Sequence, residues 1–185
     1  MSDRDRQRWN AAYAERDLPG DPSPFLTSVA EFLPTSGQAL DLAGGTGRNG
    51  LFLARRGLTV TIADVSQNAL AVAERGAAHS SLSLITQQAD FDGGFPAGPW
   101  DVLLDFNYLE RRLFDALPDL LAPGGVFVFS QPTVTNLERH PRPSRRFLLN
   151  DGELKDLLPK TFDILQFEES WACDRYEARL VAQRR

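Results

Sequence analysis

The chain has 185 residues, of which 42% are hydrophobic, and its formal net charge is −5. That length supports one sizeable core and leaves little room for a second full domain. The negative balance gives no broad positive field, which argues against nucleic acid as a partner. The single cysteine, Cys173, excludes an internal disulfide and a cysteine-based metal cluster, as suits a reducing compartment.

The amino-terminal segment MSDRDRQRW is charged where a signal peptide needs an apolar stretch, and no apolar run is as long as a membrane span. We therefore expect a cytoplasmic protein without a membrane partner. Within residues 3–16, Trp9 and Tyr13 lie four apart, on one face of a predicted helix. Their rings either pack on the core or form a lid over a ligand.

Ser23 and Pro24 predict the N-cap and first turn of a second helix, which ends at Pro34. A strand at 38–43 follows, then the glycine turn of Gly44, Gly45 and Gly47, then a helix that ends before Gly57. The next strand, 58–63, is followed by Asp64. A further helix is predicted to begin after Ser66 and to end at Gly76.

Further strands are predicted at 82–87, 102–105 and 126–130. The helix between the last two carries a buried stripe of Leu113, Leu117, Leu120 and Leu121. Asn150 and Glu153 have capping-box spacing, which predicts a helix to about residue 158. The runs 162–168 and 176–183 are joined by so short a connection that they must be antiparallel strands.

This alternation predicts an α/β fold with helices on both faces of the sheet, a doubly wound three-layer sandwich. We expect a seven-stranded, mostly parallel sheet with one antiparallel strand near its edge.

The glycine turn and three acidic residues predict a pocket for a nucleoside cofactor at one rim of this sheet. Gly45, Gly47 and Gly50 satisfy GxGxxG, a weak signal alone, since a tight turn can need glycine for shape only. Asp41 precedes the turn, and Asp64 and Asp90 follow successive strands whose carboxyl ends share that rim. Asp64 can accept hydrogen bonds from both ribose hydroxyls, and Asp90 can accept one from the adenine amine. Phe91 can flank the base.

The segments LDLAGGTGRNGLFLARRG, TIADVSQNAL, QADF, WDVLLDFNYLER and LAPGGVFVF resemble the class I S-adenosylmethionine-dependent methyltransferases, in the family's order over about residues 38–130. The chain is most similar to small single-domain enzymes of the tellurite-resistance and thiopurine type. The resemblance implies a Rossmann-like methyltransferase fold, S-adenosyl-L-methionine as cofactor and one domain over 1–185. Its parts would be a helical cap (1–34), a cofactor-binding core (38–130) and a substrate loop with the carboxyl-terminal helix and strand pair (131–185).

The resemblance also implies cofactor contacts: the methionyl end near Asp41, the ribose on Asp64, adenine at Asp90 and Phe91, and residues 105–108 beneath the sulfonium. The full set of expected cofactor-binding residues is Trp9, Tyr13, Asp41, Ala43, Gly44, Gly45, Gly47, Asn49, Asp64, Val65, Asp90, Phe91, Asp105 and Phe106. Where Ala43 stands the family usually has glycine. We expect its methyl group to cost little if the backbone there is extended.

In-line methyl transfer depends mainly on alignment, so a strong general base is optional. Asn107 and Tyr108 follow the fourth strand, where the acceptor would sit, and are the candidate catalytic residues. We expect a small-molecule acceptor and a monomer or homodimer. An anionic acceptor would suit the basic residues of the loop 131–149, which are Arg139, His140, Arg142, Arg145 and Arg146.

Two other functions stay open. The glycine motif followed by Asp64 also fits a nicotinamide-dependent oxidoreductase, although Asp41, Asp90 and the lack of a second domain argue against it. The chain could also be a non-catalytic cofactor-binding module or partner subunit, because methyl transfer needs no signature nucleophile on the protein.

Overall fold

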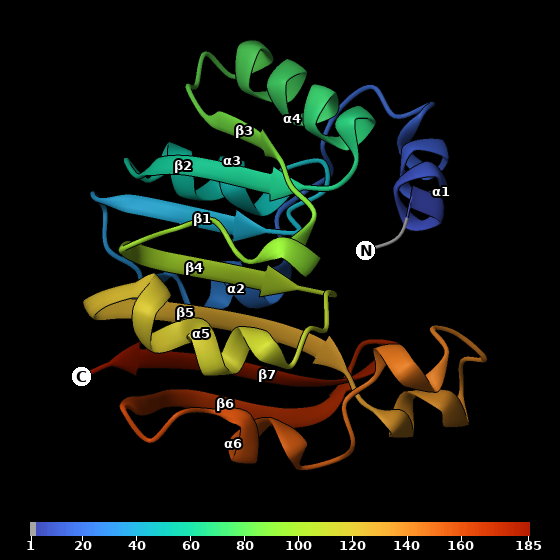
Figure 1. The fold of residues 1–185 in the computed structure, drawn as a ribbon, viewed down its shortest axis with the longest axis vertical. Coiled ribbons are helices and arrows are strands. Elements are labelled where there is room, and N and C mark those ends of the chain that lie inside the picture. Colours follow the sequence, from blue (N-terminus) through green and yellow to red (C-terminus); the bar gives the residue numbers. More distant parts are fainter. Residues whose placement is uncertain (1–2) are drawn as a thin grey trace.

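A seven-stranded sheet organises the chain in the computed structural model, which describes residues 3–185 (Figure 1). The spatial order is β3-β2-β1-β4-β5-β7-β6, and β7 runs antiparallel to both of its neighbours. The predicted, mostly parallel sheet with one antiparallel strand near its edge is therefore confirmed. The strands are β1 (Gln38–Leu42), β2 (Thr59–Asp64), β3 (Ile85–Gln88), β4 (Trp100–Phe106), β5 (Leu121–Pro132), β6 (Phe162–Ala172) and β7 (Arg175–Arg184).

Helices cover both faces of the sheet, as the alternation of strands and helices predicts. The α-helices are α1 (Asp3–Tyr13), α2 (Pro24–Ser28), α3 (Arg48–Arg55), α4 (Gln67–His79), α5 (Arg112–Leu120) and α6 (Glu153–Leu157), with short 3-10 helices at Ala30–Phe32, Phe91–Gly93, Val134–Glu138 and Arg145–Phe147. None of these helices within residues 3–185 is long and apolar enough to cross a bilayer.

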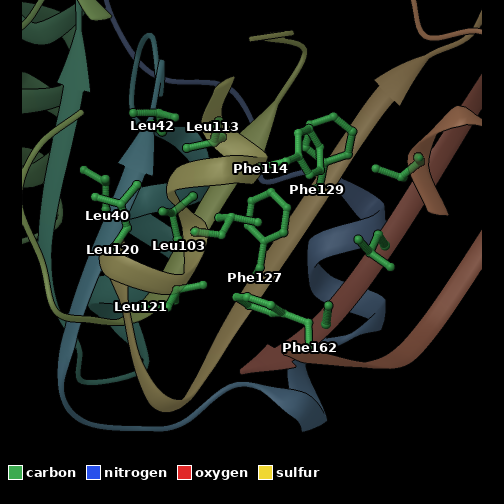
Figure 2. Packing of buried hydrophobic residues seen from close by; sticks show 14 of the residues in the cluster. Leu40, Leu42, Leu103, Leu113, Phe114, Leu120, Leu121, Phe127, Phe129 and Phe162 are labelled. Atoms are coloured by element: carbon green, nitrogen blue, oxygen red, sulfur yellow. The ribbon is translucent and has the colours of Figure 1, made fainter. Parts of the chain in front are cut away.

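The two faces of the sheet carry separate hydrophobic clusters. On β4, Val102 and Leu104 pack with α2, α3 and α4, whereas Leu103 faces α5 and α6. This alternation follows from the two-residue period of a strand. Figure 2 shows the α5 side, where Phe114 packs edge-on against Phe127 and Phe129 with ring centroids 5.9 and 5.3 Å apart.

The carboxyl ends of the parallel strands all point to one edge of the sheet. Figure 1 shows α1 and the segment 133–150 at this same edge, beyond the arrowheads of β1, β4 and β5. Two parts of the chain that are far apart in the sequence thus flank one rim, which is where ligands bind in open parallel sheets.

Several predicted helix boundaries were wrong. Helix α2 ends at Ser28 rather than at Pro34, and Leu121, predicted on the buried stripe of a helix, is the first residue of β5. Helix α4 does not end at Gly76 but continues to His79. The glycine at position 76 allows close packing against another part of the chain and does not end the helix. A Cβ on Gly76 would lie 2.4 Å from Cγ of Pro19, so only glycine allows this close approach. Helix α6 begins only at Glu153, after Gly152, although the Glu153 side chain still accepts the Asn150 N–H at 2.7 Å.

The contact with Pro19 makes Gly76 a test of this packing. We expect Gly76→Ala to lower the melting temperature even though alanine is the better helix former by about 1 kcal/mol, because the new methyl must displace Pro19. Thermal unfolding measures this. Gly93→Ala is the control, since a Cβ there has nothing within 4 Å. A Gly76→Ala protein more stable than the parent would contradict the packing role.

Candidate functional site

The turn from β1 into α3 forms the floor of the site, and its shape depends on two glycines. Gly47 is the N-cap of α3 with φ 75°, and a Cβ there would lie 2.5 Å from Cδ1 of Ile62 on β2. Gly45 has φ 55°, and a Cβ there would lie 3.0 Å from the Tyr13 hydroxyl oxygen. Glycine therefore lets the turn approach both β2 and α1 closely.

Asp64 joins this turn to the end of β2. Its Oδ2 accepts the Gly45 N–H at 2.9 Å, and its Oδ1 accepts the Ser66 N–H at 2.8 Å. Burial raises the pKa of this carboxyl, and the two backbone donors oppose that shift. Each carboxyl oxygen can accept more than one hydrogen bond, so the fixed carboxylate can still receive a ligand's hydroxyl groups.

Asp41, near the end of β1, has one carboxyl oxygen satisfied and one free. Its Oδ2 accepts the Gly50 N–H at 2.8 Å, while Oδ1 is buried without a hydrogen-bond partner among residues 3–185. Burial raises the pKa of Asp41 to about 7, and the nearby Asp64 adds to the rise. A buried acceptor without a partner is costly, so this atom favours a ligand that brings a donor, above all a cationic one.

These residues surround a cavity of about 340 Å³, which is within the usual range for a small-molecule site. The cavity brings together twelve of the sixteen residues that the sequence singled out as cofactor-binding or catalytic. They are Trp9, Tyr13, Asp41, Ala43, Gly44, Gly45, Asn49, Asp64, Val65, Phe106, Asn107 and Tyr108.

Helix α1 forms one wall of this cavity through its two aromatic rings. Trp9 and Tyr13 stack with centroids 5.9 Å apart and are only partly buried. Asn10 holds the helix to the start of α4, since its Oδ1 accepts the Ser66 hydroxyl at 2.9 Å. Of the two interpretations of this aromatic pair, its position on the cavity favours the lid.

Four of the sixteen predicted residues do not line the cavity. Gly47 shapes the turn from beneath, and Phe91 is fully buried in the core. Asp90 is exposed and lines a smaller hollow that shares only Val65 with the cavity. The adenine contacts of Asp90 and Phe91 therefore stay predictions.

Asp105 also lies away from the cavity, fully buried at the end of β4. Burial raises the pKa of this carboxyl well above its ordinary value, and only the nearby Tyr108 backbone N–H opposes that shift. Burial thus disfavours the charged form of Asp105.

Four further residues line the cavity that the sequence analysis did not single out, namely Arg16, Gly20, Thr46 and Arg48. Thr46 and Arg48 lie at variable positions of the glycine motif GTGRNG. Their place within this motif was a sequence signal from which their position at the cavity could have been predicted. Arg16 and Gly20 come from the connection after α1. That connection is fixed by α4, whose Arg75 donates to the Arg16 carbonyl at 2.8 Å, and no local sequence pattern indicates this contact.

Phe106, the last residue of β4, and Asn107 and Tyr108, which follow it, line the part of the cavity that we call the acceptor end. Asn107 has φ 64°, and its Oδ1 accepts a hydrogen bond from Arg175 of β7 at 2.7 Å. Burial raises the pKa of Tyr108, so its phenol stays protonated and can donate a hydrogen bond. This end therefore offers polar groups that can orient an acceptor, without a strong base.

The condition under which the Ala43 methyl group would cost little is not met. The backbone of Ala43 is not extended but left-handed, with φ 50°, because the turn from β1 toward Gly45 begins at this residue. A left-handed backbone costs a residue with a Cβ about 1–2 kcal/mol, and glycine avoids this cost. The usual glycine of the family therefore has a conformational reason, and Ala43 stores strain in the cavity wall.

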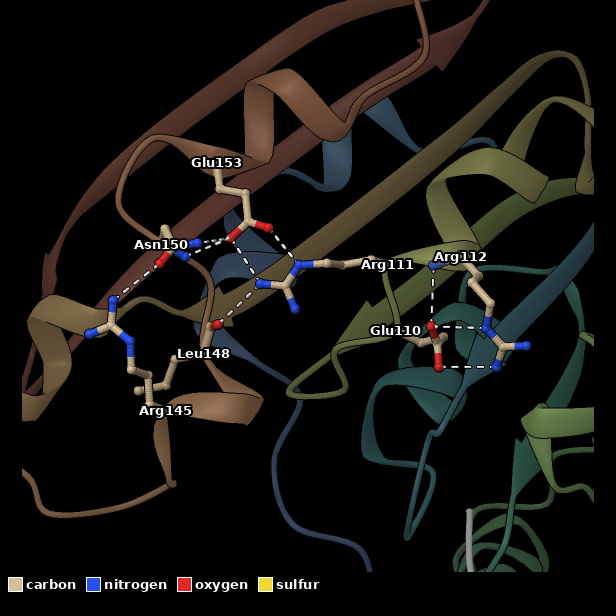
Figure 3. Close-up of polar contacts among 7 residues, drawn as sticks. All are labelled: Glu110, Arg111, Arg112, Arg145, Leu148, Asn150 and Glu153. Atoms are coloured by element: carbon tan, nitrogen blue, oxygen red, sulfur yellow. Dashed lines mark hydrogen bonds and ion pairs between the residues drawn. The ribbon is translucent and has the colours of Figure 1, made fainter.

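The arginines near the acceptor end differ in whether they already have partners (Figure 3). Arg111 donates from Nε and Nη2 to both carboxyl oxygens of Glu153, and Arg112 pairs with Glu110 at 3.1 Å. Arg145 reaches Asn150 at 3.4 Å. These side chains tie α5 and α6 together or hold the loop, which leaves other arginines of the loop 131–149 for a ligand.

The chain is similar to known proteins in sequence and in fold. Residues 39–125 match the methyltransferase-domain family. The chain is 34% identical over 110 residues to the predicted methyltransferase YqeM of Bacillus subtilis (strain 168), covering 52% of this chain and 43% of that protein. The chain thus spans less than half the length of this relative.

Two solved structures share the fold over most of the chain. TehB from Haemophilus influenzae superposes with a TM-score of 0.72 at 20% identity, covering 86% of this chain and 61% of that one. An S-adenosylmethionine-dependent methyltransferase from Mesorhizobium loti gives 0.68 at 21% identity, covering 85% and 96%. These structures confirm the expected Rossmann-like fold, and the match to the methyltransferase-domain family covers residues 39–125, which is less than half of the chain.

The strain at Ala43 leads to a stability prediction. We expect Ala43→Gly to stabilise the protein by about 0.5–1 kcal/mol, because relief of the left-handed strain exceeds the entropy that glycine loses. Thermal or denaturant unfolding checks this. Ala39→Gly, at a buried position of β1 with ordinary backbone, is the matched control and should destabilise. Equal losses of stability in both variants would show that the backbone of Ala43 is not strained.

Asp41 leads to a pH prediction. Between about pH 4 and 7 the folded protein keeps a proton that the unfolded chain has lost, so this group costs stability as the pH rises. Asp41→Asn should therefore gain stability over the parent as the pH rises from 4.5 to 8, by about 3 kcal/mol. Asp163→Asn, exposed on β6, is the control. A pH-independent difference for Asp41→Asn would show that the carboxyl is charged throughout.

Proposed function

We propose that this methyltransferase-domain chain transfers the methyl group of S-adenosylmethionine to a small molecule. The observation that carries the proposal is the Asp64 carboxylate, fixed by the N–H groups of Gly45 and Ser66 in the cavity wall. A carboxylate held in this way is oriented before a ligand arrives, so it can accept the two neighbouring hydroxyls of a ribose at little entropic cost.

The rest of the cavity fits the same cofactor. The buried, unpaired Oδ1 of Asp41 provides an acceptor for the ammonium of the methionine part. Trp9 and Tyr13 supply an apolar wall on the side of α1. The bound cofactor would supply a methyl group activated by the positive charge on sulfur.

The protein's part in the reaction is mainly positioning. Asn107 and Tyr108 at the acceptor end can orient the incoming nucleophile by hydrogen bonds, and effective molarities of about 10⁵–10⁸ M show how much alignment can contribute. Trp9 and Phe106 also line the cavity, and apolar rings there would limit the water around a charged nucleophile, which favours its reaction. A non-catalytic module would keep the same cofactor contacts and differ only in lacking transfer.

Asp64→Ala should weaken binding of S-adenosylhomocysteine by about 1–3 kcal/mol, because the ribose hydroxyls lose their acceptor. Calorimetry measures the affinity. Asp64→Asn, which keeps one acceptor oxygen, should lose less, and Asp119→Ala, exposed on α5, serves as the control. Unchanged affinity in Asp64→Ala would refute the ribose assignment, and tighter binding of a nicotinamide dinucleotide by the parent protein would favour the oxidoreductase.

Incubation with methyl-labelled S-adenosylmethionine and a panel of thiols, small amines, halides and tellurite tests the transfer itself. We expect label in at least one small-molecule product, and Asp64→Ala should reduce its rate. Cofactor binding without transfer to any acceptor would instead establish the non-catalytic module.

A further inference from the structure

A second hollow adjoins the acceptor end of the cofactor cavity. This groove, which we call the arginine groove, measures about 1110 Å³ and lies between α1, the loop 136–147 and the start of β7. Its charged lining consists of Arg8, Arg142, Arg146 and Arg175, with Asp174 and His140. Four guanidinium groups and a single carboxylate thus meet at one concave surface of a chain whose net charge is −5.

The positive charge of the groove is largely uncompensated. Arg142 and Arg146 have no carboxylate partner in the described part of the chain, although Arg146 lies over the ring of Phe147 at 4.4 Å. The carboxylate of Asp174 is engaged by His140, with Nε2 and Oδ2 3.3 Å apart. By contrast, Arg111 and Arg112 outside the groove are paired with glutamates. Unpaired guanidiniums clustered in a concavity repel one another, and an anion relieves that repulsion.

The loop that carries these arginines is held firmly to the sheet. Asn136 is buried, its Oδ1 accepts the Tyr176 N–H at 3.2 Å, and its Nδ2 donates to the Arg142 carbonyl at 3.5 Å. Val134 and Leu149 close the base of the loop, with the Val134 N–H 2.8 Å from the Leu149 carbonyl. The groove is therefore shaped before binding, so less ordering entropy is lost when a ligand enters.

Two contacts connect the groove to the cofactor cavity. Arg175 lines the groove and donates to Asn107, which lines the cavity, at 2.7 Å. On the other side, the Arg8 guanidinium lies 4.8 Å from the ring centroid of Trp9, which also lines the cavity. These two contacts make the groove a neighbour of the cofactor cavity, so a small molecule bound in the groove would lie next to the acceptor end.

We propose that the methyl acceptor is an anionic small molecule, bearing a carboxylate or a phosphate that the arginine groove binds through Arg142 and Arg146. This inference rests on the proposed function, because it assigns the groove to the acceptor of that reaction. Arg175, already paired with Glu177 at 3.2 Å, positions Asn107 and does not supply the main anion contact. Bidentate guanidinium contacts suit both anions, and the size of the groove favours a molecule larger than a bare inorganic ion.

The test measures binding of three matched probes, phenyl phosphate, benzoate and benzamide, to protein saturated with S-adenosylhomocysteine. We expect the anions to bind about tenfold or more tightly than neutral benzamide, with affinity that falls as salt rises. The variant Arg142→Gln/Arg146→Gln should abolish this preference and leave S-adenosylhomocysteine affinity unchanged.

The control Arg145→Gln/Arg185→Gln removes the same charge, from the same loop and from the carboxyl terminus, but not from the groove. It should keep the preference for anions. Loss of the preference in the control, or no preference in the parent, would overturn the proposal while leaving the cofactor assignment intact. Failure of S-adenosylhomocysteine to bind would overturn the proposed function instead. Equal labelled-methyl transfer to 2-mercaptobenzoate and 2-mercaptobenzamide would refute the anionic acceptor even if the groove binds anions.

Discussion

The hydrogen bond from the Gly45 N–H to the Asp64 carboxylate holds the site together. It ties the turn after β1 to the end of the neighbouring strand β2, across 19 residues of sequence. Burying a carboxylate is costly, as the raised pKa of Asp64 shows, and the backbone donors of Gly45 and Ser66 offset part of that cost. The geometry of the turn, the position of Gly47 against Ile62 and the opening of the cavity all depend on this link.

The acidic residues of the site and the arginine groove lie at different parts of the sheet edge. The acidic residues Asp41 and Asp64 come from β1 and β2, whereas Asn107 follows β4 and the arginine groove lies between α1, the loop after β5 and the start of β7. The strand order reverses between β1 and β4, and crossovers leave in opposite directions from this point, opening a crevice there. A cofactor with an ammonium and hydroxyls would suit one side of the crevice, and an anion the other.

Helix α1 completes the crevice although it is not part of the sheet. Its polar contacts to α4 run through Asn10, while the Tyr13 hydroxyl lies close to Gly45 and Trp9 lines the cavity. The surface of the helix is highly charged, so its hold on the rest of the molecule comes from a few aromatic and polar contacts rather than from a buried apolar face. Segments held in this way have low local stability, which suits a wall that must admit a ligand.

The sequence alone determined the seven strands, the helices on both faces, the glycine turn and most of the cavity lining. Those features follow local rules, since alternation, capping and glycine spacing act within a few residues. Only the tertiary structure decided that Ala43 is left-handed, that Gly76 packs against Pro19, that Asp90 lies outside the cavity and that Arg175 meets Asn107. The contacts of Gly76 with Pro19 and of Arg175 with Asn107 join residues up to 68 positions apart, and strand order and register bring such residues together. No local pattern encodes that register.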